Sequence, residues 1–256
     1  FQTPQIIGHR GAAEYAPENT RESILTAFDM GVKWVEVDVK LTKDGVPIIF
    51  HDDELDRTTD GAGLVANTLY EDIKTLDAGS WFGPSFAGAK ILTLVEFLDI
   101  LEEKGMSANL EIKPCPGREK ETAEVVMDYL TRCWDEPDRI LISSFSHVSL
   151  EVAMDMADYY PRGFLLDEVW PDNWQELAKH LDVSVVSFNG HTVTREDVED
   201  AIDFGKPITA YTINDAQKAR QLQGWGVDGF FTDAPDVLVG NLIRSVPNVA
   251  AKGPKP

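Results

Sequence analysis

Two carboxylates alternate with valines in WVEVDVK, residues 34–40, a segment whose composition is otherwise typical of a buried β-strand. Side chains alternate across a strand, so Glu36 and Asp38 share one face and the valines share the other. Burying an unpaired carboxylate is costly, and a like charge beside it adds to the cost. A divalent cation offsets this most simply, and all-oxygen ligands favour Mg²⁺ or Ca²⁺ over zinc.

The segment ANLEIK, residues 108–113, repeats this arrangement. Leu110 and Ile112 share one face, and Glu111 and Lys113 share the other. Glu111 is therefore a candidate third inward carboxylate. Lys113 could supply a point charge for a phosphate, although a structural ion pair with Glu111 is the strongest alternative.

Two histidines are expected at the same place. His9 and Arg10 lie between glycines at the end of QIIGHRG, and the turn at residues 43–45 returns PIIFH antiparallel to 34–40. That hairpin places His51 roughly opposite Asp38. Each histidine has a non-catalytic alternative, because His9 could simply end a strand and His51 could cap a turn. Imidazole exchanges protons near neutral pH, and guanidinium offers a planar fork for phosphate oxygens.

A metal site, two imidazoles and two cationic side chains suit phosphoryl transfer. The cation and the basic side chains would stabilise charge on the phosphoryl oxygens, and the histidines would move protons on the attacking and leaving oxygens.

The elements that must position these residues alternate regularly between strand and helix. If PIIFHD is the return arm of a hairpin, the 256-residue chain contains eight βα units. Such alternation favours a parallel sheet, and eight units in about 250 residues predict an α/β TIM (β/α)₈ barrel, with its active site at the C-terminal ends of the strands. We expect one domain over residues 1–256, with an insertion at about 41–91. An open doubly wound sheet is the alternative, but no glycine-rich GxGxxG follows the first strand.

Composition excludes several classes of protein. The formal net charge of −21 disfavours a nucleic-acid binder or a protein that docks on anionic membranes. No apolar run reaches the length of a membrane span, and no stable membrane insertion is expected. Cys115 and Cys133 are expected to be free thiols. The N-terminus does not resemble a signal peptide, so we expect a cytoplasmic protein; a periplasmic protein whose leader has been removed is the alternative.

Three long segments together form a pattern specific enough to indicate a protein family. They are GHRGAAEYAPENT, WVEVDVKLTKDGVPIIFHDDELDRTTDG and ANLEIKP. They resemble the glycerophosphodiester phosphodiesterase family of phospholipase C-like TIM-barrel phosphodiesterases. The resemblance extends through ISSF, AYTIN and GVDGFFTD over nearly the whole chain. It implies hydrolysis of glycerophosphodiesters, such as glycerophosphocholine or glycerophosphoethanolamine, to sn-glycerol 3-phosphate and an alcohol.

The resemblance also implies roles for seven of the residues above. They are an acid–base pair of His9 and His51, a site for one divalent cation at Glu36, Asp38 and Glu111, and phosphate contacts from Arg10 and Lys113. Attack by water and attack by a neighbouring glycerol hydroxyl through a cyclic phosphate are both open.

Other polar and aromatic residues receive more ordinary predictions. Glu18 and Asn19 precede a helix and are expected to cap it, Asp52 is a solvated turn residue or orients a histidine, and Arg57 fastens the insertion. Tyr211, in AYTIN at a strand end, is the best candidate for a substrate contact. It would belong to an aromatic wall with Trp81, Phe82 and Phe188.

Two other functions remain open from sequence. The same barrel could cleave lysophospholipids as a lysophospholipase D, which would need an apolar channel, for example in the 61–91 insertion. A non-catalytic barrel could only bind a phosphodiester, but such a descendant would be expected to lose its histidines before its carboxylates. The expected partner is a small-molecule substrate, and homo-oligomerisation is left open.

Overall fold

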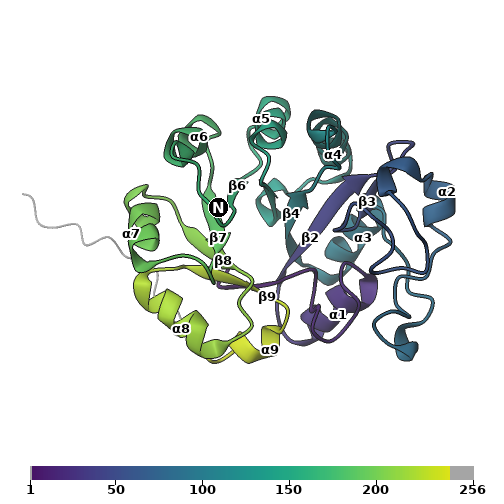
Figure 1. Cartoon of the computed structure of the whole chain (residues 1–256), viewed down its shortest axis with the longest axis horizontal. Helices are drawn as coiled ribbons and strands as arrows, with labels where there is room; N and C mark the ends of the chain where they lie inside the picture. Colours follow the sequence, from purple (N-terminus) through teal and green to yellow (C-terminus); the bar gives the residue numbers. More distant parts are fainter. Residues whose placement is uncertain (1, 243–256) are drawn as a thin grey trace, which may run out of the picture.

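The computed structural model describes residues 2–242 and contains a closed parallel barrel surrounded by helices (Figure 1). Each barrel strand pairs in parallel with its two neighbours, and pairing of β1 with β2 and with β9 closes the cylinder. The eight strands are β1 (Ile6–Gly8), β2 (Trp34–Leu41), β4 (Ser107–Ile112), β5 (Ile140–Ser144), β6 (Arg162–Leu166), β7 (Val185–Asn189), β8 (Ile208–Tyr211) and β9 (Gly229–Thr232). The predicted TIM barrel is confirmed.

Helices follow the strands and cover the outside of the barrel (Figure 1). They are α1 (Arg21–Asp29), α3 (Leu94–Lys104), α4 (Glu119–Cys133), α5 (His147–Met156), α6 (Trp174–His180), α7 (Arg195–Asp203), α8 (Ala216–Trp225) and the short α9 (Pro235–Leu238), with the 3₁₀ turn η3 (Pro137–Arg139) before β5. Capping sets several boundaries, as at Thr93, whose side chain accepts from Glu96 N while the Glu96 carboxylate accepts from Thr93 N.

The alternation of side chains along β2 explains the core. Val35, Val37 and Val39 are fully buried in the apolar layer between barrel and helices, so Glu36 and Asp38 point into the barrel. The strand β3 (Pro47–Ile49) runs antiparallel to β2, with Val39 opposite Ile49. The predicted hairpin is therefore present, and it directs the chain after β3 back toward the carboxylates.

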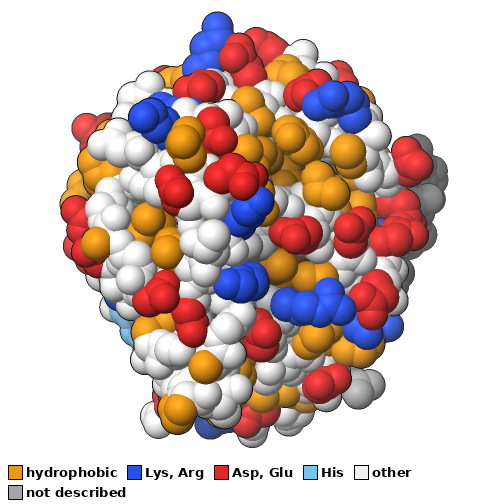
Figure 2. All heavy atoms as spheres, turned by 90° about the vertical axis from the view of Figure 1, so that its right-hand side faces the viewer, with side chains coloured by type: hydrophobic (Ala, Val, Ile, Leu, Met, Phe, Trp, Pro, Cys, Tyr) orange, Lys and Arg blue, Asp and Glu red, His pale blue; other side chains and the backbone are white. Residues whose placement is uncertain are grey.

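The insertion after β3 packs beside the barrel (Figure 1), and its apolar side chains form a second small cluster together with Ile48 of β3 and Cys115 after β4. It includes η1 (Val65–Asn67), α2 (Tyr70–Ile73) and η2 (Pro84–Phe86). Figure 2 shows the right-hand side of Figure 1, where acidic and basic side chains are interspersed and no basic patch covers the face. Between residues 2 and 242, no helix has both the length and the apolar character needed to cross a membrane.

Candidate active site

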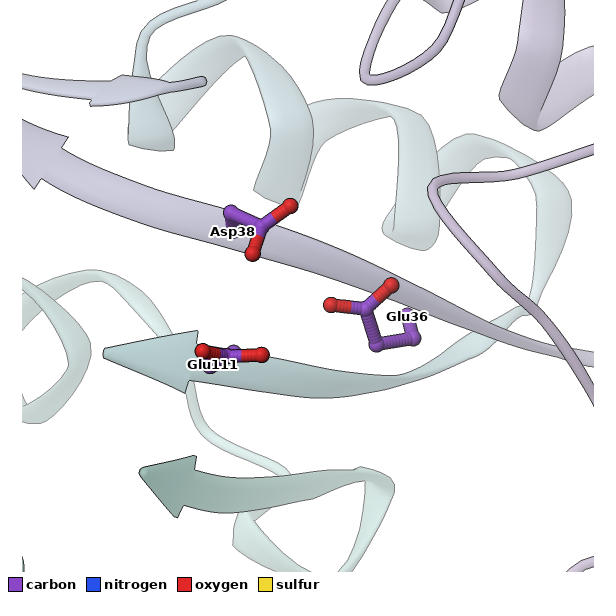
Figure 3. A group of neighbouring side chains, drawn as sticks. All are labelled: Glu36, Asp38 and Glu111. Atoms are coloured by element: carbon purple, nitrogen blue, oxygen red, sulfur yellow. The ribbon is translucent and has the colours of Figure 1, made fainter. Parts of the chain in front are cut away.

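Three buried carboxylates meet inside the barrel (Figure 3). Glu36 and Asp38 lie on β2 and Glu111 on β4, where Asp38 and Glu111 are register partners. Each offers an oxygen within 4.8 Å of the other two. The alternation predicted from the sequence therefore places all three side chains in one space.

These acids cannot all ionise easily without a compensating charge. Burial, followed by the charges of Asp38 and Glu111, raises the pKa of Glu36 well above its usual value. Burial and Asp38 raise the pKa of Glu111 to about 7. Burial also disfavours the charged form of Asp38, but Arg10 and other cations outweigh it and lower the pKa to about 2. An all-oxygen, acid-rich set of this kind fits a divalent cation, which the triad could hold.

Asp38 has a polar partner that the sequence reasoning missed. Asn19 Nδ2 donates to Asp38 Oδ2 over 2.9 Å, and the Asp38 amide donates to Asn19 Oδ1. The expectation that Asn19 caps α1 is wrong, because the N-cap is Thr20, whose hydroxyl accepts from Ser23 N. Asn19 adopts φ 58°, a left-handed conformation that asparagine tolerates better than most residues.

A tight turn after β1 presents His9 and Arg10 to the triad. The turn needs Gly8, because a Cβ there would lie 2.4 Å from the carbonyl oxygen of Gly11. His9 Nδ1 donates to Asp233 Oδ1 over 2.6 Å, and His9 Nε2 lies 3.9 Å from Glu36 Oε2. A carboxylate only accepts, so this bond places a proton on Nδ1 and leaves Nε2 facing the carboxylates.

Asp233, at the end of β9, was not identified from sequence. Burial by itself would raise its pKa, but hydrogen bonds from His9 and Asn214 lower the pKa below its usual value. The Asn214 amide donates to Asp233 Oδ2, while the next residue, Asp215, caps α8. The only sequence signal for Asp233 is its place at a strand end.

His51 reaches the site from the hairpin. Phe50 N donates to Asp38 O, and His51 Nδ1 donates to Asp52 Oδ1 over 2.6 Å. Burial lowers the pKa of His51 despite the opposing charge of Asp38. Asp53, two residues after His51, accepts a 2.8 Å hydrogen bond from the fully buried Lys40, which anchors the chain after the histidine.

Two basic side chains border the carboxylate triad. Arg10 donates through its backbone N–H to Glu36 Oε2 over 2.9 Å, and its Nε lies 3.5 Å from Asp38 Oδ2. Lys113 Nζ lies 3.2 Å from Glu111 Oε1 and 5.5 Å from the centroid of the Phe145 ring. Lys113 therefore makes the predicted ion pair and also lines the cavity.

One cavity brings together most of the residues predicted from the sequence, and Asp38 lies beside it, buried against Glu36 and Glu111. Its lining residues are His9, Arg10, Glu36, His51, Asn109, Glu111, Lys113, Phe145, Leu165, Tyr211, Thr212 and Phe231. The Tyr211 hydroxyl donates to Leu166 O, which leaves its ring to line the cavity. The rest of the expected aromatic wall is wrong: Phe188 is buried against Trp170, and Trp81 and Phe82 pack against each other in the insertion. Phe145 and Phe231 take their place.

Comparison with known proteins agrees with this geometry. Residues 9–237 match the model of the glycerophosphoryl diester phosphodiesterase family. The chain belongs to this family. A glycerophosphodiester phosphodiesterase of Caldanaerobacter subterraneus is 34% identical, with 93% of this chain and 97% of the relative covered. A Bacillus subtilis enzyme of the same name is also 34% identical, over 91% of this chain and 84% of its own length.

Solved structures of the family have the same fold. An Oleispira antarctica phosphodiesterase in complex with the product sn-glycerol-3-phosphate is 39% identical and superposes with a TM-score of 0.89, covering 93% of this chain and 96% of the other. The Agrobacterium tumefaciens glycerophosphodiester phosphodiesterase is 27% identical, with a TM-score of 0.77 over 93% of this chain and all of its own. The prediction of an enzyme of this family is confirmed.

Proposed function

We propose that this family member hydrolyses glycerophosphodiesters, such as glycerophosphocholine or glycerophosphoethanolamine, to sn-glycerol 3-phosphate and an alcohol. The observation that carries the proposal is one cavity lined by two histidines, two basic side chains, Glu36 and Glu111, with Asp38 completing the carboxylate triad behind them. The product bound to the Oleispira antarctica relative supports the choice of substrate.

Glu36, Asp38 and Glu111 would hold one divalent cation, either Mg²⁺ or Ca²⁺. When bound, the cation supplies Lewis-acid stabilisation of negative charge on the phosphoryl oxygens. The raised pKa values of Glu36 and Glu111 support this assignment, because a positive charge between these acids removes the cost of ionising them.

Arg10 and Lys113 bind the phosphate. Each is already paired with a carboxylate, Arg10 with Glu18 and Lys113 with Glu111, and each also lines the cavity. These carboxylates fix the positions of both basic side chains before substrate arrives. Preorganised positive charge of this kind stabilises a transition state without the cost of reorganisation.

His9 and His51 share the proton transfers. Each uses Nδ1 to bond a carboxylate, and therefore each keeps Nε2 for a reacting oxygen. One imidazole takes the proton of the attacking oxygen as its bond to phosphorus forms. The other gives a proton to the alcohol oxygen as its bond to phosphorus breaks. The attacking oxygen belongs to water, or to the neighbouring glycerol hydroxyl in a route through a cyclic phosphate.

Tyr211 contributes a ring face for the carbon skeleton of the substrate. Its ring packs edge-on against Phe145, and the two form an apolar side of the cavity beside Lys113. Cleavage of lysophospholipids has less support, because the lining of this cavity includes no residue of the 61–91 insertion.

One assay tests the proposal. Purified protein is incubated with glycerophosphocholine in EDTA, Mg²⁺ or Ca²⁺, and sn-glycerol 3-phosphate is measured, with lysophosphatidylcholine as a parallel substrate. Turnover should require a cation, and it should be lost in His9→Ala and in His51→Ala. His180→Ala is the matched control, because His180 lies at the surface and pairs with Glu151. Full activity in EDTA, or in either active-site variant, would contradict the mechanism.

A further inference from the structure

Arg57, in the insertion, joins two carboxylates at the side of the cavity. Its Nη1 and Nη2 donate to the two oxygens of Glu18 over 2.8 and 2.7 Å. Its Nε and Nη2 donate to the two oxygens of Asp52 over 2.7 and 2.8 Å. One guanidinium therefore makes two bidentate ion pairs, the geometry in which arginine fixes orientation best.

Each of these carboxylates also bonds a group in the cavity. Asp52 Oδ1 accepts from His51 Nδ1, and Glu18 Oε1 accepts from Arg10 Nη1 over 2.8 Å. The result is a continuous chain of charged hydrogen bonds from His51 through Arg57 to Arg10. Glu18 and Arg57 are absent from the cavity lining, so they act through the residues they hold.

The charges of this chain are mutually supported. Burial disfavours ionisation of Glu18, but hydrogen bonds and charge from Arg57 and Arg10 lower its pKa. Arg57, foremost, lowers the pKa of Asp52 far below its usual value. The expectation that Glu18 caps α1 is wrong, because its carboxylate accepts hydrogen bonds from the two arginines.

We propose that Arg57 is a positioning residue that couples the orientation of His51 to that of Arg10. The inference rests on the proposed function, in which His51 moves a proton and Arg10 binds the phosphate. His51 follows the β2–β3 hairpin and Arg10 follows β1, so these two groups reach the cavity on separate segments. Arg57 ties the segments together through side chains that already contact each reacting group.

The competing explanation is that Arg57 only fastens the insertion to the barrel. Arg118 offers a matched control for that role. It donates to the carbonyl oxygens of Leu41 and Thr42, at the turn end of the β2–β3 hairpin where Leu41 pairs with Pro47. His51 lies beyond the other end of β3, and Arg118 does not line the cavity. Loss of Arg118 should lower stability without changing the reacting groups.

The first experiment compares Arg57→Ala, Arg57→Lys and Arg118→Ala by steady-state kinetics on glycerophosphocholine at saturating metal, with thermal unfolding of each. Arg57→Ala should lower kcat and raise KM, with kcat/KM falling on the order of 10–100-fold, because small misplacements of reacting groups are costly. Arg57→Lys should recover part of the loss, since an ammonium keeps the charge but not the double fork. Arg118→Ala should keep kcat and KM within about twofold.

The second experiment is a double-mutant cycle of Asp52→Asn and Glu18→Gln. Their effects on kcat/KM should be non-additive by about threefold or more when Arg57 is present, and additive in the Arg57→Ala background. Additivity in both backgrounds, or an Arg57→Ala protein that behaves like Arg118→Ala, would overturn the coupling.

His51→Ala separates this inference from the proposed function. If His51→Ala is inactive while Arg57→Ala is unimpaired, the coupling alone is wrong. If His51→Ala keeps wild-type turnover, the acid–base assignment is wrong and the coupling falls with it.

Discussion

Removal of divalent cations with EDTA should make the stability of this protein fall between pH 5 and pH 8, and the cause lies in Glu111. Its carboxyl is buried beside Asp38, which raises its pKa from 4.5 to about 7 in the folded protein. The folded state therefore holds a proton that the unfolded chain releases. The stability that this proton confers is complete below pH 4.5 and is lost as the pH rises through 7.

The expected magnitude follows from the difference between the two pKa values. At about 1.36 kcal/mol for each tenfold change in proton affinity, Glu111 destabilises the cation-free fold by about 3 kcal/mol at pH 8, most of it developing above pH 5. For a chain of this size, this corresponds to a fall in Tm of about 5–10 °C. Glu36, whose pKa is also raised, acts in the same direction. Asp38, with a pKa of about 2, has made its contribution before pH 5.

The assay is thermal unfolding in EDTA at several pH values, for the wild type and for Glu111→Gln. The comparison is needed because the lowered pKa of His51 adds stability over part of the same range. The wild type should lose more Tm than Glu111→Gln, and saturating Mg²⁺ or Ca²⁺ should remove the difference by favouring the ionised carboxylates. If both proteins depend on pH in the same way, the electrostatic account of the triad is refuted.

Three further substitutions test the contacts of the site. Asp233→Asn should lower kcat on the order of 10–100-fold with little change in KM, because His9 loses the carboxylate that fixes its tautomer. A rise in KM as large as the fall in kcat would contradict this reasoning. Asn19→Ala should weaken Mg²⁺ binding about 10–100-fold in calorimetric titration, since Asp38 loses a buried hydrogen bond, and an unchanged affinity would exclude the role. Lys113→Gln should raise KM about tenfold or more for the anionic substrate. If only Tm changes, Lys113 serves as the ion-pair partner of Glu111 and does not bind the phosphate.

Much of the candidate site was accessible from the sequence because strands impose a simple rule on their side chains. Glu36, Asp38 and Glu111 were placed together by alternation and by the expected pairing of neighbouring parallel strands. His51 was placed by the turn at 43–45, because a strand that returns antiparallel to 34–40 carries the residues after it back past Asp38. These inferences depend on local geometry, which repeats along a strand.

The residues that hold the site were not accessible in the same way. Asp233 meets His9 because β9 pairs with β1 when the barrel closes, a contact between strands more than 200 residues apart in the sequence. Asn19 and Glu18 lie just before α1, where polar side chains often cap a helix. Only the fold shows that Thr20 is the cap and that Asn19 bonds Asp38.

The sequence by itself determined the eight strand–helix units, the inward carboxylates and the hairpin that returns a histidine, because periodicity and turn residues act over short stretches of chain. The tertiary structure alone decided which carboxylate orients each imidazole, which aromatic rings line the cavity, and that Arg57 links Asp52 to Glu18. Those contacts join loops whose relative positions are set by barrel closure and by packing of the insertion, and neither leaves a periodic signal in the residues concerned.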